Sequence, residues 1–365
     1  MIDQPRLLVA HAISYPHKLL GLQLDEWDLL VRQARVSNLL ARIGYLLAQS
    51  DLLEQVPEAP QRHLQAAMLV AEKQKLAIEW EIQCIQEAIA HTGLPVVLLK
   101  GAAYVANDLP PSMGRLFSDV DILVPKADIN RAEQALKLHG WVSSKLDAYD
   151  QRYYRKWMHE LPPLRHMERQ TVIDVHHTIL PESGRLRPDP QKMLSNIQAV
   201  ANQPNVFTLD AYDMILHNAA HLFHEGEFHH GLRDLVDFDS LIRHFCHLQD
   251  FWLLLLRRAQ QQQLIGPLFY AARYAHKLLR TPMPDSFIES LTGQQNSIHT
   301  AVMDFLFMRA LLPDHRSCDI WGVGFARWAL YVRSHYLRMP LYLLIPHLLR
   351  KSIRGRLELD DRVTP

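Results

Sequence analysis

The chain has 365 residues, which suits two or three structural modules and is too long for one small domain. Apolar residues make up 48% of it, and 39 basic side chains are balanced by 39 acidic ones. This composition predicts a protein with a well-packed core. It provides no overall charge that would attract a long nucleic acid, and we therefore do not expect such a partner.

The cysteines and the apolar segments indicate where the protein is found. Cys84, Cys246 and Cys318 are odd in number and widely spaced, so they fit neither a disulfide framework nor a CxxC metal motif. The first residues lack the pattern of a signal peptide, and runs such as FWLLLL are too short to span a bilayer. We expect a cytoplasmic protein without a transmembrane segment.

The mixed apolar and basic tail, residues 333–356, is compatible with peripheral contact to a membrane, although a helix packed on the protein explains it better.

The first part of the chain is helical in pattern. Apolar residues recur at spacings of three and four between residues 24 and 90, with Pro57 and Pro60 in a break between two segments. This pattern predicts a supporting layer of helices.

From residue 94 short strands alternate with helices. We predict strands at residues 95–99, 118–124 and 171–180, a helix at 100–109, and an amphipathic helix from Asp128, its N-cap, to a stop at Gly140. Residues 153–164 are expected to form a strand and a turn, and after Pro181 the pattern is helical almost to the end. The prediction is an α+β fold with a helical region at 1–93, a small mixed core at 94–185 and a helical domain at 186–365.

The stretch GRLFSDVDILV raises the first functional question. Asp119 and Asp121 are two residues apart in a predicted strand, so their side chains share one face. Adjacent carboxylates repel each other unless a cation lies between them, and Mg²⁺ accepts carboxylate oxygens while keeping positions open for phosphate. Alone, such a pair is more often the solvated end of a strand.

Two further stretches favour the metal interpretation. In LPVVLLKGAAY a strand enters Lys100–Gly101 and a helix follows, so Gly101 permits a tight turn and close approach of a ligand, and Lys100 adds a positive charge. An ordinary strand-to-helix turn gives the same pattern, and no Walker A motif is present. In TVIDVHHT, alternation places Asp174 and His176 on one face. If this strand lies beside residues 118–124, it brings Asp174 to the same ions, whereas an acid on an edge strand that faces water gives the same pattern.

Together, the three stretches KGAAY, R-x-x-x-D-V-D-I-L-V and V-I-D-V-H-H resemble the polymerase-β-like nucleotidyltransferase superfamily. Within it, they resemble the bacterial group of uncharacterised nucleotidyltransferases. The resemblance covers residues 94–180 well and FHHGLRDLVDFDSLI more loosely. It implies that Asp119 and Asp121 bind Mg²⁺ or Mn²⁺, and that Asp174 is a third carboxylate that binds metal and helps to activate an acceptor hydroxyl.

The resemblance also implies a set of nucleotide-binding residues, which are Lys100, Gly101, Ala102, Arg115 and Ser118. Ala102 replaces the second small residue, often Ser or Gly, of the usual turn, so backbone amides have to make that phosphate contact. The implied reaction is attack of an acceptor hydroxyl on the α-phosphorus of an NTP, with pyrophosphate leaving. The acceptor is not identified, and a sugar-linked one is favoured by the resemblance alone. The alternative is a degenerate domain that binds a nucleotide without turning it over.

A histidine-rich segment, LHNAAHLFHEGEFHHGLRDL, allows one more interpretation. His217, His221 and His224 share a helical face and, with His229, His230 and Asp234, suggest a zinc or dinuclear site of a phosphohydrolase. The segment has neither an adjacent His-Asp pair nor HExxH. We therefore favour a polar helix face that lines the cleft opposite the sheet. The candidate substrate contacts are His176, His217, His221, Arg233 and Asp237.

Overall fold

A mixed sheet of seven short strands carries the predicted site residues. In this computed structural model, which describes residues 6–143, 148–226, 228–293 and 297–339, the strands occur in the order β3-β4-β5-β2-β1-β7-β6. They are β1 (Val96–Leu98), β2 (Val120–Leu123), β3 (Trp141–Ser143), β4 (Leu164–His166), β5 (Val172–His176), β6 (Gln198–Ala199) and β7 (Val206–Thr208). The predicted α+β class is confirmed.

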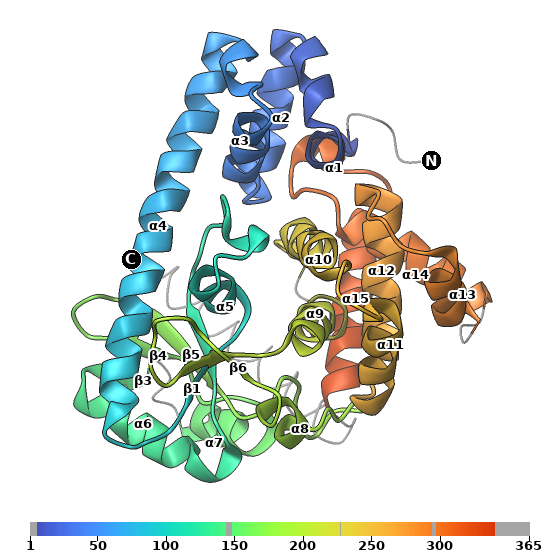
Figure 1. The fold of residues 1–365 in the computed structure, drawn as a ribbon. Coiled ribbons are helices and arrows are strands. Elements are labelled where there is room, and N and C mark those ends of the chain that lie inside the picture. The colour runs from blue at the N-terminus through green and yellow to red at the C-terminus, as the bar shows by residue number, and fades with distance from the viewer. Residues whose placement is uncertain (1–5, 144–147, 227, 294–296, 340–365) are drawn as a thin grey trace, which may run out of the picture.

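Helices and the loops between them form the rest of the described chain, and short 3-10 turns join several of the helices (Figure 1). They are α1 (Leu8–Ser14), α2 (Leu24–Val36), α3 (Leu40–Gln49), α4 (Glu58–Ala90), α5 (Lys100–Ala106), α6 (Ile129–Leu138), α7 (Ala148–Trp157), α8 (Pro190–Leu194), α9 (Ala211–Ala220), α10 (Gly231–Phe245), α11 (Phe251–Gln261), α12 (Ile265–Leu279), α13 (Asp285–Thr292), α14 (Ser297–Ala310) and α15 (Val323–Arg338).

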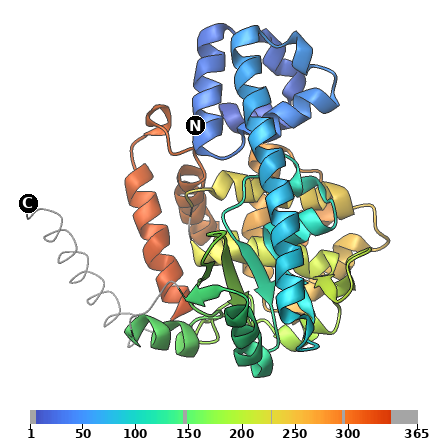
Figure 2. The same cartoon turned by 90° about the vertical axis from the view of Figure 1, so that its left-hand side faces the viewer.

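The long helix α4 joins the N-terminal helices to the sheet. It packs on α3 at one end and on α5, α6, β1 and β2 further along, as Figures 1 and 2 show. On the other side of α5 lies α9, which also packs on α10 and α12. The short helix α5 is therefore held between the N-terminal and C-terminal groups of helices.

The middle of the sheet is buried, and its register is set by apolar residues. All three residues of β1 and all four residues of β2 are buried, which is typical of a strand covered on both faces. The strand β1 runs antiparallel to β2 and parallel to β7, while β2 runs parallel to β5. Residues at equivalent positions of β2 and β5 therefore have side chains on the same face.

Two predicted elements are wrong. The strand and turn expected at residues 153–164 begin inside the helix α7, which covers Ala148–Trp157, and the strand β4 starts only at Leu164. The region after residue 185 was expected to be helical, but it contributes β6 and β7 to the same sheet. The division at residue 185 thus does not coincide with the end of the sheet, and the three-module organisation stays a prediction.

Smaller details of the predicted helices also differ. Pro60 lies in the first turn of α4 instead of in the break before it, and the break between α3 and α4 covers residues 50–57. Asp128 occupies the N-cap position of α6, but its carboxylate binds Arg131 at 2.7 Å and caps no backbone amide. Gly140 does end this helix, with φ of +95°, a conformation that glycine adopts without steric cost.

The loop before β2 is fixed against the N-terminal helices. Gly114 has φ of +66°, and a Cβ there would lie 2.6 Å from the backbone nitrogen of Arg42, so only glycine allows this close approach. The Arg42 guanidinium donates to the carbonyl oxygens of Pro110 and Pro111 at 2.6 and 2.8 Å. These contacts hold the chain that leads into the predicted carboxylates.

Across the described residues, we find no helix with both the length and the apolar character needed to cross a membrane. Most of the tail for which peripheral membrane contact was considered, residues 340–356, lies outside the described residues.

Candidate active site

Three aspartates from two adjacent parallel strands meet at one place in the sheet. Asp121 lies within β2 and Asp119 immediately before it. Asp121 and Asp174 are register partners on β2 and β5, and neighbouring strands are about 4.8 Å apart. The structure thus brings the third predicted carboxylate beside the first two.

The three carboxylates repel one another. Burial, followed by the charge of Asp121 and that of Glu160, raises the pKa of Asp174 to about 8. Burial and the charge of Asp121 also raise the pKa of Asp119. In addition, the Oδ1 atom of Asp174 is buried and has no hydrogen-bond partner. A group of acids in this state is destabilising until a cation or protons compensate it.

Lys100 supplies one positive charge to this group. Its ammonium nitrogen lies 3.2 Å from Oδ1 of Asp121. Burial alone would raise the pKa of Asp121, but Lys100 and the hydrogen bond from His176 hold it well below its usual range. Asp121 is thus the carboxylate that stays ionised, while Asp174 is the one whose pKa is raised most by burial and by its neighbours.

The turn between β1 and α5 differs from the expected one. The left-handed residue is Lys100, the first residue of α5, with φ of +45°, and Gly101 and Ala102 follow it in the helix. A Cβ on Gly101 would lie 2.9 Å from Cδ1 of Phe117. The absence of a side chain at this glycine is therefore needed for the close packing of Phe117, and Gly101 and Ala102 are both buried.

Arg115 and Ser118 lie on the loop that leads into β2. Nε of Arg115 is 3.1 Å from Oδ2 of Asp237, and the guanidinium lies over the rings of Tyr104 and Phe117. The exposed Ser118 hydroxyl donates to Oδ1 of Asp119 at 3.0 Å. Ser118 is thus the predicted nucleotide-binding residue closest to the carboxylates along the chain, while Arg115 is anchored to α10.

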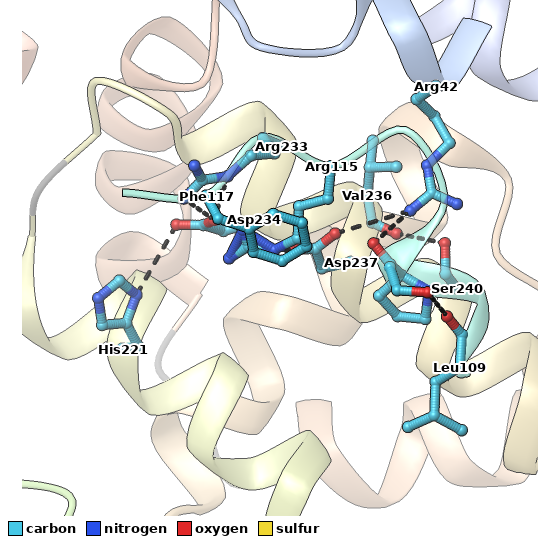
Figure 3. Close-up of polar contacts among 12 residues, drawn as sticks. Arg42, Leu109, Arg115, Phe117, His221, Arg233, Asp234, Val236, Asp237 and Ser240 are labelled. Atoms are coloured by element: carbon cyan, nitrogen blue, oxygen red, sulfur yellow. Dashed lines mark hydrogen bonds and ion pairs between the residues drawn. The ribbon is translucent and has the colours of Figure 1, made fainter. Parts of the chain in front are cut away.

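Figure 3 shows a charged cluster from α3, α10 and the loop before β2. Arg115 and Arg233 of this cluster both interact electrostatically with Asp119. Arg233 donates from Nε and from a terminal nitrogen to Oδ1 of Asp234, at 2.9 and 2.7 Å. Asp237 is 2% exposed, and a terminal nitrogen of Arg42 approaches its Oδ1 at 3.9 Å. Burial raises the pKa of Asp237 against the opposing charges of Arg115 and Arg233.

This charge cluster changes the expected role of Asp237. Asp237 is buried behind Arg115, so in this structure it orients arginines instead of presenting a free carboxylate to a substrate. Nδ1 of His221 is 3.7 Å from Oδ2 of Asp234, at the edge of the same cluster. Arg42, which the sequence did not single out, completes the cluster, and burial lowers its pKa to about 10.

Two of the predicted histidines lie deeper in the structure. His176 is 2% exposed, and its Nε2 is 2.8 Å from Oδ1 of Asp121. His217, on α9, is also buried, and burial together with the charge of Lys100 holds its pKa well below the usual value. The influence of Lys100 and His176 on His217 shows that α9 faces the carboxylates. A neutral His217 can donate or accept a hydrogen bond there without adding charge.

In the described part of the histidine-rich segment, which leaves out residue 227, no three metal-ligating side chains come together. The helix α9 ends at Ala220 and passes into a π-helical turn at His221–Glu225. This turn interrupts the regular α-helical spacing that would align His217, His221 and His224 on one face. Among the residues that the structure describes, the group of three metal-ligating side chains with ligand atoms within 4.8 Å of one another consists of His159, Glu160 and His176. His159 and Glu160 were missed by sequence reasoning, since they follow α7 in an irregular segment.

The three aspartates fit a divalent cation. Their combined charge raises two pKa values, and the buried Oδ1 of Asp174 has no hydrogen-bond partner. Carboxylate oxygens are the ligands that Mg²⁺ and Mn²⁺ prefer. Lys100 competes for Oδ1 of Asp121 in this structure, so a cation and Lys100 have to share that carboxylate.

Comparison with known proteins places the chain in a family. The sequence profile of the family described as uncharacterised nucleotidyltransferase matches residues 23–280, well over half of the chain. Neither the curated proteins nor the solved structures contain a significant match. The matched range begins just before α2 and ends just after α12, so it includes α2, α3 and α4, the sheet with its aspartates and the arginine cluster on α10. The chain therefore belongs to this family of nucleotidyltransferases.

Proposed function

We propose that this protein transfers an NMP group from an NTP to a hydroxyl acceptor, with Asp119, Asp121 and Asp174 as the catalytic carboxylates. The observation that carries the proposal is the register of β2 and β5, which puts Asp121 and Asp174 side by side next to Asp119. In the proposed assignment, the chain is a member of the polymerase-β-like superfamily, and Mg²⁺ or Mn²⁺ is held by these three side chains. The bound cation would polarise the phosphate oxygens and lower the pKa of the attacking hydroxyl.

The reaction requires a place for the proton of the acceptor. In the proposed step, the acceptor oxygen forms a bond to the α-phosphorus while the bond from that phosphorus to the bridging oxygen of pyrophosphate breaks. The hydroxyl proton passes to Asp174, which lies beside Asp121 on the neighbouring strand and whose Oδ1 has no hydrogen-bond partner. A carboxylate within hydrogen-bond reach of the hydroxyl can accept this proton in the transition state.

The arginine cluster is the proposed site for the triphosphate charge. Arg42, Arg115 and Arg233 face the two carboxylates of Asp234 and Asp237, which leaves one positive charge in excess. The charge of Asp119 contributes to raising the pKa of Arg233, so the cluster and Asp119 are close enough to interact electrostatically. Guanidinium groups that are already oriented bind phosphate oxygens with little loss of conformational entropy. Ser118 and Lys100 are the other proposed nucleotide contacts, and His217 and His221 are proposed to face the base or the acceptor.

The proposal is tested by nucleotide binding and by turnover. We expect an NTP analogue with an α,β-methylene bridge to bind only in the presence of Mg²⁺ or Mn²⁺. We also expect pyrophosphate release from an NTP when sugars, sugar phosphates or hydroxyl-bearing proteins are supplied as acceptors. Asp121→Asn and Asp174→Asn should each lower turnover at least 100-fold.

The matched control is Asp108→Asn, because Asp108 makes an exposed ion pair with Lys75. This variant should keep full activity. Binding of the analogue without any pyrophosphate release over the whole acceptor panel would indicate a degenerate binding domain instead. Full activity in Asp121→Asn or Asp174→Asn would refute the assignment of the site.

A further inference from the structure

A second group of metal-ligating side chains lies at the end of β5. Residues 159–161 run antiparallel to this end of the strand, with Glu160 as the bridge partner of His176. The amide of His177 donates to the carbonyl oxygen of His159 at 2.9 Å, and the amide of Leu161 donates to Val175 at 2.9 Å. Backbone hydrogen bonds on both sides thus fix the relative positions of the three side chains.

The ligand atoms of this group converge. Nδ1 of His176 is 3.4 Å from Oε2 of Glu160, and Nε2 of His159 is 3.9 Å from the same oxygen. The two imidazole rings are stacked, with their centroids 5.2 Å apart. Two ligands bound tetrahedrally to one Zn²⁺ at ~2.0–2.1 Å are roughly 3.4 Å from each other. The observed separations therefore need only small side-chain movements to admit an ion.

The two nitrogens of His176 have different surroundings. Nε2 is hydrogen-bonded to Oδ1 of Asp121 at 2.8 Å. Nδ1 is buried and has no hydrogen-bond partner, although it points toward Glu160. A histidine that binds a metal through one nitrogen commonly donates its other N–H to a carboxylate, which fixes the tautomer. His176 already makes that outer hydrogen bond through Nε2, and its Nδ1 faces the Glu160 carboxylate at 3.4 Å without a hydrogen bond.

The type of ligand decides which ion is expected. Two imidazole nitrogens and one carboxylate oxygen suit Zn²⁺ and its transition-metal neighbours, whereas Mg²⁺ and Ca²⁺ prefer oxygen ligands throughout. The group is also largely buried, since His159 and His176 are 4% and 2% exposed. A buried ion with two imidazole ligands would be retained when the protein is purified.

We propose that Nε2 of His159, Oε2 of Glu160 and Nδ1 of His176 bind a Zn²⁺ ion, in a site distinct from the three aspartates. His176 connects the two sites, because its Nε2–H is donated to Asp121. The Zn²⁺ ion would hold the imidazole in the tautomer that makes this bond and so would keep Asp121 in position. The zinc site does not depend on the proposed nucleotidyl transfer.

The test is metal analysis of the full chain purified without chelator and without an affinity tag rich in histidine. We expect about one Zn²⁺ per chain that survives dialysis against millimolar Mg²⁺. His159→Ala and the nearly isosteric Glu160→Gln should each reduce the retained zinc at least tenfold. Substitution with Co²⁺ should give the visible d–d bands of a low-coordinate nitrogen- and oxygen-ligated ion, and Glu160→Gln should change their positions.

The control variant is His244→Ala/His247→Ala, which removes one histidine in the last turn of α10 and one just after it, with rings 6.2 Å apart. It should retain zinc fully. Asp174→Asn should also retain zinc while losing nucleotide turnover, which separates this proposal from the previous one. Wild-type protein without zinc, or equal retention by Glu160→Gln and wild type in chains of equal thermal stability, would overturn the proposal.

Discussion

The ammonium group of Lys100 lies 3.2 Å from Oδ1 of Asp121, on the carboxylate that is central to the proposed cation site. Lys100 is the first residue of α5 and has a left-handed backbone, while Asp121 lies in the adjacent strand β2. The side chain that stabilises the carboxylates in the absence of a metal is therefore a competitor when a metal binds. This relationship can be measured.

Lys100→Met should make the protein bind Mn²⁺ more tightly in the absence of a nucleotide. The substitution keeps the length of the side chain and removes its charge, so repulsion between the ammonium and the incoming cation disappears. We expect the dissociation constant to fall about tenfold, which corresponds to ~1.4 kcal/mol. Titration calorimetry or the electron paramagnetic resonance signal of free Mn²⁺ provides the measurement. Turnover of the NTP should decrease, since Lys100 is also a proposed phosphate contact.

The control for this variant is Lys75→Met, which removes an ammonium group from the exposed pair with Asp108, at 2.8 Å. It should leave the Mn²⁺ affinity unchanged. An unchanged or weaker affinity in Lys100→Met would show that the lysine does not compete with the cation.

Asp174→Asn should alter how stability depends on pH in metal-free protein. The pKa of Asp174 in the folded protein is about 8, above the value of about 3.9 in an unfolded chain. Between these values the folded state holds more protons, so the wild-type free energy of unfolding falls as pH rises from about 4 to about 8. Asparagine removes this dependence, and at pH 8.5 the variant should be more stable by on the order of 2 kcal/mol, allowing for screening by solvent.

Urea unfolding in EDTA at pH 5 and at pH 8.5 measures this effect, and the gain should be much smaller at the lower pH. Adding Mg²⁺ should stabilise the wild type more than the variant at pH 8.5. Parallel pH profiles for the two proteins would mean that burial and the neighbouring charges do not raise the pKa of Asp174.

Gly101→Ala should destabilise the protein through one contact. The added Cβ would lie 2.9 Å from Cδ1 and 3.1 Å from Cε1 of Phe117, and this packing allows little movement because Gly101 is buried in α5. We expect a loss of ~1–2 kcal/mol, measured by chemical unfolding. The double variant Gly101→Ala/Phe117→Leu should recover part of this lost stability.

The contrasting control is Gly266→Ala in α12, where an added Cβ meets nothing within 4 Å and should stabilise the protein by ~0.5 kcal/mol. Equal effects of the two alanine substitutions would show that Phe117 moves aside freely.

The carboxylates could be predicted from the sequence because strand alternation is a local rule. Asp121 and Asp174 each lie in a short β-branched run, and the register that pairs them follows once both runs are placed in one buried sheet. The helix boundaries at Gly140 and near Pro57 are likewise set by neighbouring residues. These predictions needed no information about distant parts of the chain.

The features that were missed depend on contacts between distant segments. The strand β7 has only three residues, and it is a strand because β1 accepts it as a parallel partner. Arg42 belongs to the site because the loop at Pro110 folds back over α3. His159 and Glu160 follow a helix and precede two prolines, so no periodic pattern distinguishes them until β5 pairs beside them. The left-handed residue at the turn is Lys100 instead of Gly101, since Gly101 is needed where Phe117 packs.

The parallel pairing of β1 with β7 has a consequence for synthesis of the chain. The strand β1 lies between β2 and β7, and β7 is made long after all the strands on the other side of β1. A nascent chain that has been synthesised only to residue 185 therefore has both the aspartates and an apolar strand with one unpaired edge. Such edges pair readily with other chains. We expect the ribosome-bound intermediate to be the form most prone to aggregate and most dependent on chaperones, until residues 206–208 emerge and cover the edge.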